Sequence, residues 1–229
     1  MFDSAVAEIE AAYSRLNTGL GWQFLYTPAA TISCPTGVML VGINPGGDEF
    51  SIGASIEAGN AYLVESWSGN GAVLQSQVRE LFGVLHNTGA VPGISPREAL
   101  DQTLTTNYCP FRSPRWSELP RREEAVAFSN RFWARLLPQI SPRLVLCMGG
   151  KPYEMFSALL QREASRTFEE KRWDTGWGKC QFKARGYALE GSKTALAFIP
   201  HLSTFKLMSR KACIPYVEQF AYDIQKYAA

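Results

Sequence analysis

Apolar positions along the chain follow two spacings that alternate. Residues 3–18 carry apolar side chains at intervals of three or four, which predicts an amphipathic helix. Residues 37–41 instead form a nearly unbroken apolar run, which is typical of a strand buried on both faces. Because the two patterns recur in turn, the chain is expected to alternate between helices and strands.

The same patterns predict the remaining elements. Helical spacing recurs at residues 72–86, 121–137 and 217–227, and Pro152 opens one more helix. Ser95-Pro96-Arg97-Glu98 has the form of a capping box with proline at the first helical position, so a short helix should follow it. Apolar runs predict four strands, at residues 37–41, 104–108, 144–148 and 194–199.

Residues 166–190 mix charges, glycines and aromatic residues, and a small hairpin is the expectation there. The chain shows no internal repeat and no linker. Helices that alternate with strands over 229 residues predict a single α/β domain at residues 1–229.

Each predicted strand runs into an unusual sequence. The four segments are "GINPGG" at 42–47, "NYCPFR" at 107–112, "MGGKP" at 148–152 and "PHLSTFK" at 200–206. In open α/β sheets, ligands bind outside the carboxyl ends of the strands. We therefore expect these four segments to meet at one edge of the sheet and to form the functional site.

The first segment has alternative interpretations. Dinucleotide-binding loops need G-x-G-x-x-G and P-loops need G-x-x-x-x-G-K-[ST], and neither pattern is present. Pro45 also removes a backbone N–H that a phosphate cradle would use. A strand exit built only from turn residues stays open on this evidence.

Composition narrows the classes of function. A net charge of +2 excludes a histone-like nucleic-acid binder but permits a local basic face. No apolar run reaches the ~20 residues that span a bilayer, and the N-terminus does not resemble a signal peptide. The five cysteines form no C-x2-C pair, so we expect reduced thiols, no metal site and a cytoplasmic protein.

Three segments together resemble a known family. "GINPG" at 42–46, "TNYCPFR" at 106–112 and "PHLSTFK" at 200–206 look like the motifs of the uracil-DNA glycosylase superfamily, in the family's order. An asparagine in the first motif is the form found in its single-strand-selective monofunctional and mismatch-specific branches. The resemblance implies a three-layer α/β/α fold with a mostly parallel four-stranded sheet. It also implies a monomeric, cofactor-free glycosylase that acts on DNA containing a damaged or deaminated base.

The resemblance also assigns roles to residues. Asn44 would position the attacking water, His201 would donate a hydrogen bond to the departing base, and Asn107 would read the edge of the base. The rest of the implied substrate-binding set is Gly42, Ile43, Pro45, Gly46, Phe50, Tyr62 and Cys109. The implied DNA-binding set is Arg112, Ser203, Thr204, Phe205 and Lys206, with Phe205 and its neighbours as the wedge that replaces a flipped nucleotide.

Two departures from the family pattern affect this interpretation. Leu202, in the 200–206 segment that resembles the family's second motif, stands where that motif usually has proline, which changes the expected loop geometry. The phenylalanine that stacks on the base in the family falls near Glu57 here, so Phe50 or Tyr62 must take its place.

Other functions remain open. A member of the same fold could bind nucleic acid or a nucleobase without catalysis, or a hydrolase could act on free nucleosides or nucleotides. An interaction domain, in which the strand ends are merely turns, is a third alternative. A thiol nucleophile built from Cys109 and His201 is disfavoured, because the apolar surroundings of the cysteine give no reason for a lowered thiol pKa.

Overall fold

A seven-stranded sheet forms the centre of the computed structural model, which describes residues 1–228 apart from the side chains of 226 and 228. Four parallel strands make up one side of the sheet, in the order β4, β2, β5 and β9. They are β4 (Leu104–Asn107), β2 (Val38–Gly42), β5 (Leu144–Met148) and β9 (Ser192–Ile199). These match the four predicted strands closely.

Three antiparallel strands enlarge the sheet beyond the four strands that we expected. β8 (Gln181–Leu189) pairs with β9, and both β6 (Arg166–Thr167) and β7 (Lys171–Asp174) pair with β8. The hairpin expected within residues 166–190 is confirmed by the antiparallel pair β7–β8, but the count of four was too small because β8 also pairs with β9. Their alternating polar and apolar residues let one face of β8 pack on the core while the other carries charge.

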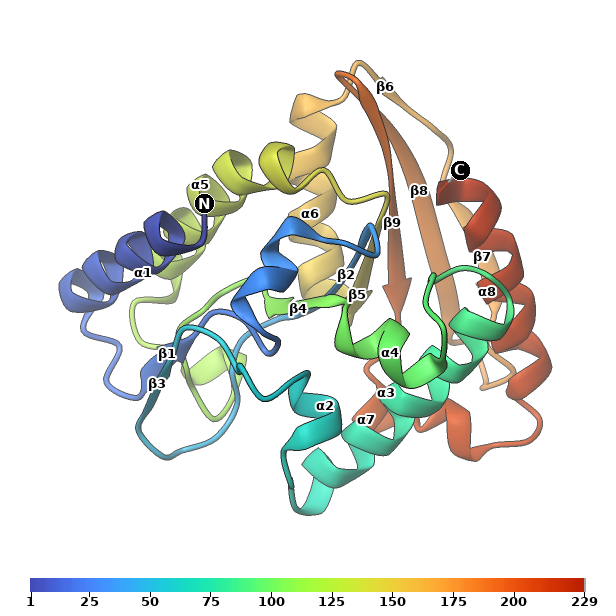
Figure 1. Cartoon of the computed structure of the whole chain (residues 1–229), viewed down its shortest axis with the longest axis horizontal. Helices are drawn as coiled ribbons and strands as arrows, with labels where there is room; N and C mark the ends of the chain where they lie inside the picture. Colours follow the sequence, from blue (N-terminus) through green and yellow to red (C-terminus); the bar gives the residue numbers. More distant parts are fainter. Residues whose placement is uncertain (229) are drawn as a thin grey trace.

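Helices cover both faces of the sheet (Figure 1). Packed on one face are α1 (Phe2–Leu16), α5 (Arg122–Ile140) and α6 (Gly150–Glu163). On the other are α3 (Gly69–Asn87), α4 (Pro96–Asp101) and α8 (Ile214–Ala228). Successive strand residues point to opposite faces, so Met39 and Val41 join the first core while Val38 and Leu40 join the second. The three-layer α/β/α fold is therefore confirmed.

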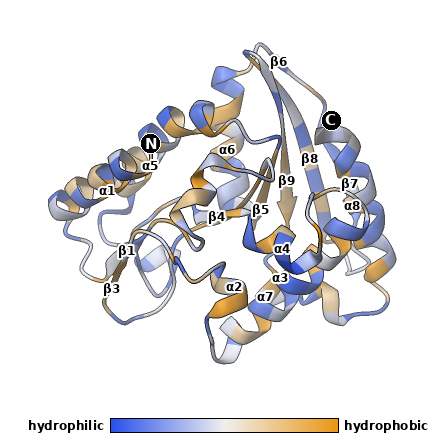
Figure 2. Ribbon diagram, viewed as in Figure 1, coloured by the Kyte–Doolittle hydropathy of each residue, from blue (hydrophilic) through white to orange (hydrophobic). Residues whose placement is uncertain are grey.

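Most predicted helices differ from the observed ones only at their ends. The capping box at Ser95 is confirmed, since its Oγ accepts a hydrogen bond from the Glu98 backbone N–H at 3.2 Å. The Glu98 carboxylate in turn accepts one from the Ile94 N–H at 2.8 Å. Helix α5 continues three residues past the predicted end because Ile140 is buried in the core. Figure 2 shows hydrophobic and hydrophilic residues alternating along these helices, as expected for elements with one buried side.

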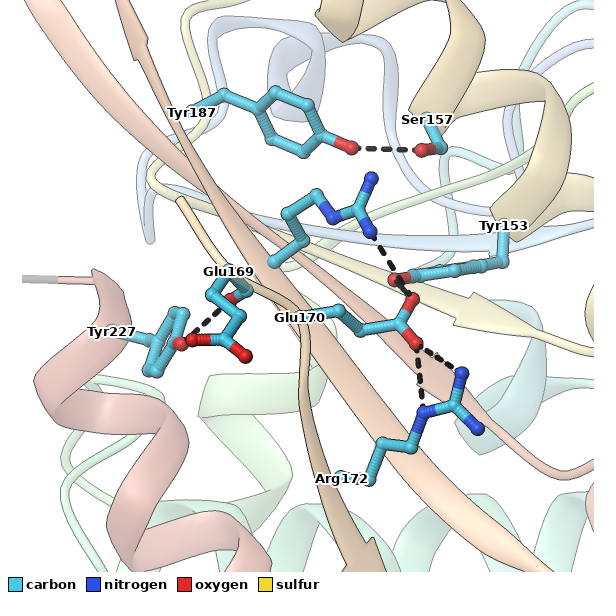
Figure 3. A network of polar contacts seen from close by, with 8 residues as sticks. Tyr153, Ser157, Glu169, Glu170, Arg172, Tyr187 and Tyr227 are labelled. Atoms are coloured by element: carbon cyan, nitrogen blue, oxygen red, sulfur yellow. Dashed lines mark hydrogen bonds and ion pairs between the residues drawn. The ribbon is translucent and has the colours of Figure 1, made fainter. Parts of the chain in front are cut away.

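A polar network attaches the antiparallel strands to the helices (Figure 3). The Glu170 carboxylate, before β7, accepts hydrogen bonds from the Tyr153 hydroxyl of α6 at 2.8 Å and from Arg172 Nε at 3.0 Å. On β8, the hydroxyl of Tyr187 lies 2.8 Å from the hydroxyl of Ser157 in α6. These contacts hold the added strands against the parallel part of the sheet.

Smaller elements complete the fold. An unexpected parallel pair joins β1 (Gly21–Gln23) to β3 (Ser51–Gly53). The short helices are α2 (Ala61–Val64), α7 (Leu202–Phe205) and the 3-10 turns η1 (Ala29–Ser33), η2 (Trp116–Glu118) and η3 (Leu207–Ser209). None of the helices in the described residues is long and apolar enough to cross a lipid bilayer.

Candidate active site

A cavity of about 960 Å³ opens at the carboxyl ends of the parallel strands. The segments that follow β2 and β9 contribute Asn44 and His201, while β4 and β5 contribute their last residues, Asn107 and Met148. The predicted convergence of four strand ends is thus present. The predicted site residues that line this cavity are Gly42, Ile43, Asn44, Gly46, Phe50, Tyr62, Asn107, Arg112, His201 and Ser203.

Asn44 is held in a fixed orientation. Its side-chain amide Nδ2 donates to the buried Ser113 hydroxyl at 3.0 Å and to the Pro45 carbonyl at 2.9 Å. The Ser113 hydroxyl then donates to the Arg115 carbonyl at 2.9 Å, so it can only accept from Asn44. With the amide nitrogen engaged, the side-chain oxygen of Asn44 remains available to accept a hydrogen bond from a water in the cavity.

Asn107 sits directly beside Gly42 across the β2–β4 pairing. A Cβ atom on residue 42 would lie 2.2 Å from Asn107 Oδ1, so only glycine leaves room for this side-chain position. The Asn107 side chain is also hydrogen-bonded to the hydroxyl of Tyr26. Burial raises the pKa of Tyr26 to about 12, so this phenol stays protonated at neutral pH.

His201 is the N-cap residue of α7, and its ring is fixed by a neighbour. Its Nδ1 lies 2.9 Å from the Ser203 hydroxyl. Burial lowers the pKa of His201 below its ordinary value, so the imidazole is neutral at pH 7. When the Ser203 hydroxyl donates to Nδ1, the proton of the neutral ring resides on Nε2, which can then donate a hydrogen bond to a ligand.

Arg112 brings a positive charge to the cavity. Its Nη1 donates to the Gly46 carbonyl. Its Nε is buried and has no hydrogen-bond partner among the described residues. Three carboxylates, those of Asp48, Glu49 and Glu65, also line the cavity and are exposed to solvent.

Aromatic side chains form one wall of the cavity. Tyr62 is buried and meets Trp67 edge to face, with ring centroids 5.0 Å apart. Phe50 lies at the mouth and is 63% exposed. Both residues that the sequence offered as base-stacking candidates thus line the cavity. Tyr26, Gln23 and Trp67 also line the cavity, and no motif in the sequence pointed to them.

Five predicted site residues do not line the cavity: Pro45, Cys109, Thr204, Phe205 and Lys206. Cys109 is fully buried in the core, where burial raises the pKa of its thiol to about 12. It therefore contributes no thiolate, and its position between Tyr108 and Pro110 serves packing. Thr204 and Lys206 are exposed on α7 and at its C-cap, while Phe205 packs against the core.

The cavity combines uncharged polar groups with charged ones. Its uncharged groups include the carboxamides of Asn44, Asn107 and Gln23, a neutral imidazole and a phenol, beside the Arg112 guanidinium and the exposed carboxylates. In residues 1–228 no group of three histidine, cysteine, aspartate or glutamate side chains is arranged to hold a metal ion. The arrangement can bind one water beside Asn44 and can pair with an amide edge through Asn107.

Comparison with known families agrees with this geometry. A family model described as the uracil DNA glycosylase superfamily matches residues 31–220. The chain belongs to the uracil DNA glycosylase superfamily. The matched range contains every strand of the seven-stranded sheet and the three cavity residues Asn44, Asn107 and His201. A search of curated proteins found no match.

Proposed function

We propose that this superfamily member is a monofunctional DNA glycosylase that releases uracil or a related deaminated or modified base from DNA. The observation that carries the proposal is the convergence of Asn44, Asn107 and His201 on one cavity from three separate strand ends. The asparagine at position 44 favours a place near the single-strand-selective monofunctional and mismatch-specific branches. The proposed partner is DNA, and the proposed enzyme is a cytoplasmic monomer without a cofactor.

The proposed reaction breaks the bond between the base nitrogen and sugar C1′. The Asn44 side-chain oxygen holds a water beside C1′, and the water oxygen forms the new bond as the base leaves with the electron pair. A carboxamide is too weak a base to remove the proton early, so Asn44 positions the water, and the proton passes to surrounding solvent as the C1′–O bond forms. His201 Nε2–H donates to the base oxygen on which negative charge develops.

Asn107 is proposed to read the base. Its carboxamide offers one donor and one acceptor, which is the complement of the amide edge of uracil. Gly42 leaves room for it, and Tyr26 holds it in place. The same edge occurs on 5-hydroxymethyluracil and, in a purine frame, on hypoxanthine, so these bases belong to the proposed substrate range.

A base-release assay tests the proposal. Excess protein is incubated with labelled oligonucleotides that carry one uracil, hydroxymethyluracil or hypoxanthine, single-stranded or paired. Free base is measured by chromatography, and abasic sites are measured by alkaline cleavage. We expect both products in equal amounts from at least one substrate and no strand cleavage before alkali.

Other outcomes would replace the proposal with a specific alternative. Binding to the oligonucleotides without base release, by protein shown to be folded, would indicate a non-catalytic nucleic-acid binder. Release of base from free deoxyuridine at a rate that DNA does not exceed would indicate a nucleoside hydrolase.

A further inference from the structure

The aromatic residue of the second motif is held inside the protein. Phe205 packs against the core, and its ring meets that of Trp177 at 6.1 Å and 78°. Trp177 lies in the turn between β7 and β8 and is covered by the Arg210 guanidinium, 3.2 Å from the ring centroid. Phe205 could enter a DNA duplex only if this stack were taken apart.

The backbone that follows Phe205 is also fixed from a second side. Gln77 of α3 is buried, and its side-chain oxygen accepts from the Met208 N–H at 2.8 Å. Its side-chain nitrogen donates to the Ser209 hydroxyl at 2.7 Å. Because α3 and the β7–β8 turn both restrain this segment, Phe205 is poorly placed to act as a mobile wedge.

The side chain of Phe50, in contrast, is exposed to solvent. Seven large apolar side chains are exposed in the described residues: Met1, Phe50, Ile52, Val64, Ile94, Tyr216 and Tyr222. Of these seven, only Phe50 lines the cavity. Ile52, two residues further on, is 50% exposed but does not line the cavity. An exposed phenylalanine at the mouth of a binding cavity is a more informative feature than an isolated surface leucine.

The backbone around Phe50 is anchored although its side chain is not. The Ser51 N–H donates to the Leu20 carbonyl at 3.1 Å, and Ser51 pairs with Gly21 in the β1–β3 ladder. A Cβ atom on residue 21 would lie 2.0 Å from the Ser51 carbonyl oxygen, so glycine is needed for this close approach. On the other side, Arg112 binds the Gly46 carbonyl. The ring therefore projects from a fixed support.

We propose that Phe50, and not Phe205, enters the base stack of duplex DNA and fills the space that the extruded nucleotide leaves. This inference rests on the proposed function. Side chains that act in this way are apolar, project from the protein surface and stand beside the pocket that receives the base. Phe50 meets all three conditions, whereas Phe205 is partly buried and does not line the cavity.

A comparison of single-stranded and duplex substrates tests the inference. The variants are Phe50→Ala, the conservative Phe50→Leu, and Ile94→Ala as a matched control at another exposed apolar position. Unstacking costs a few kcal/mol in a duplex and little in a single strand. Phe50→Ala is thus expected to slow excision from duplex DNA at least about tenfold. Excision from single strands should be nearly unchanged, Phe50→Leu should recover much of the loss, and Ile94→Ala should match the wild type.

An equal loss on both substrates would overturn the inference and make Phe50 a residue that stacks on the base inside the cavity. Unchanged excision on both would also overturn it.

A second readout separates this inference from the proposed function. A duplex carrying 2-aminopurine beside the target base becomes more fluorescent when that base leaves the stack, whether or not it is cleaved. The Asn44→Ala protein should produce the rise, and the protein with both Asn44→Ala and Phe50→Ala should not. A rise without base release by the wild type would contradict only the proposed function. No rise, or a rise that does not depend on Phe50, would contradict the inference that Phe50 fills the space left by the extruded nucleotide.

Discussion

The segments after β2 and β9 both deliver a functional side chain to the cavity, but they are held differently. The Asn44 side chain, after β2, is held by Ser113 and by the Pro45 carbonyl, and the following residues 46–50 are exposed to solvent. His201, after β9, begins a segment that α3 and the β7–β8 turn hold from two sides. Both segments therefore have an anchored backbone, but residues 46–50 face solvent, whereas Phe205 packs against the core.

This difference indicates that the two segments have different roles. The segment after β9 has a buried leucine at position 202, and its rigidity comes from Gln77 and Trp177. Those contacts keep the His201 imidazole in place, and they also hold the Phe205 ring against the core. In the segment after β2, by contrast, the exposed side chain of Phe50 can contact DNA.

The largest expected effect comes from disturbing the position of Asn107. Gly42→Ala places a Cβ atom 2.2 Å from Asn107 Oδ1 and forces that side chain to move. A displacement of about 1 Å can cost about a hundredfold in rate, so we expect a loss of that order in excision. Single-turnover rates measure it. Gly83→Ala is the control, because a Cβ atom there meets nothing within 4 Å. Equal rates for the two variants would show that Asn107 does not act in the reaction.

Urea unfolding tests how firmly the segment after β9 is held. Gln77→Ala removes the partners of the Met208 N–H and the Ser209 hydroxyl. Leaving a buried N–H unpaired costs about 1–3 kcal/mol, and urea unfolding should show a loss in that range. Phe50→Ala and the exposed Gln102→Ala should each stay within about 0.5 kcal/mol of the wild type. A destabilisation by Phe50→Ala equal to that of Gln77→Ala would remove the contrast between the two segments.

The pH dependence of excision reports on His201. Burial lowers its pKa, so the neutral form persists to a lower pH than in the unfolded chain. The stability that this group contributes is present above its unfolded pKa and is lost as pH falls through the folded value. We expect the acidic limb of the excision profile below pH 6.5, with that limb absent in His201→Gln. A limb centred above pH 6.5 would mean that the charged form of His201 is stabilised instead.

The smallest expected effect concerns the acidic residues before Phe50. Asp48 and Glu49 are exposed and repel DNA phosphates, so Asp48→Asn with Glu49→Gln should tighten DNA binding by about two- to fivefold at low salt. Glu163→Gln with Glu190→Gln is the control, since Glu163 ends α6 and Glu190 follows β8, both at the edge of the sheet away from the cavity. Fluorescence anisotropy at several salt concentrations measures the change. Equal affinities for the two double variants would place DNA away from Phe50.

Much of the fold could be predicted from the sequence because the parallel strands are apolar on both faces. Val38–Val41 and Leu144–Met148 bury every side chain, so their composition identifies them without knowledge of their partners. β6, β7 and β8 could not be predicted as part of the sheet from their half-exposed sequences. They join it only because β8 pairs with β9, and β6 and β7 pair with β8. β1 and β3 are short and depend on the contact of Gly21 with Ser51.

The candidate site divides in the same way. Asn44 and His201 follow predicted strands and Asn107 lies near the end of one, so topology alone places them together. Tyr26 and Trp67 reach the cavity from segments without regular strand or helix patterns, and only the folded chain shows them there. Phe205 occupies a motif position in the sequence. Trp177, which restrains it, lies in residues 166–190, where the sequence predicted a small hairpin.

The measurement that tests the central claim most directly is single-turnover excision by the wild type, Asn44→Ala and His201→Ala on the best substrate. Removing one preorganised group costs about a hundredfold or more in comparable sites, so each variant should lose at least that much. Both variants should retain DNA binding and the unfolding midpoint to within small shifts. Wild-type rates in both variants would contradict the assignment of this cavity as the active site.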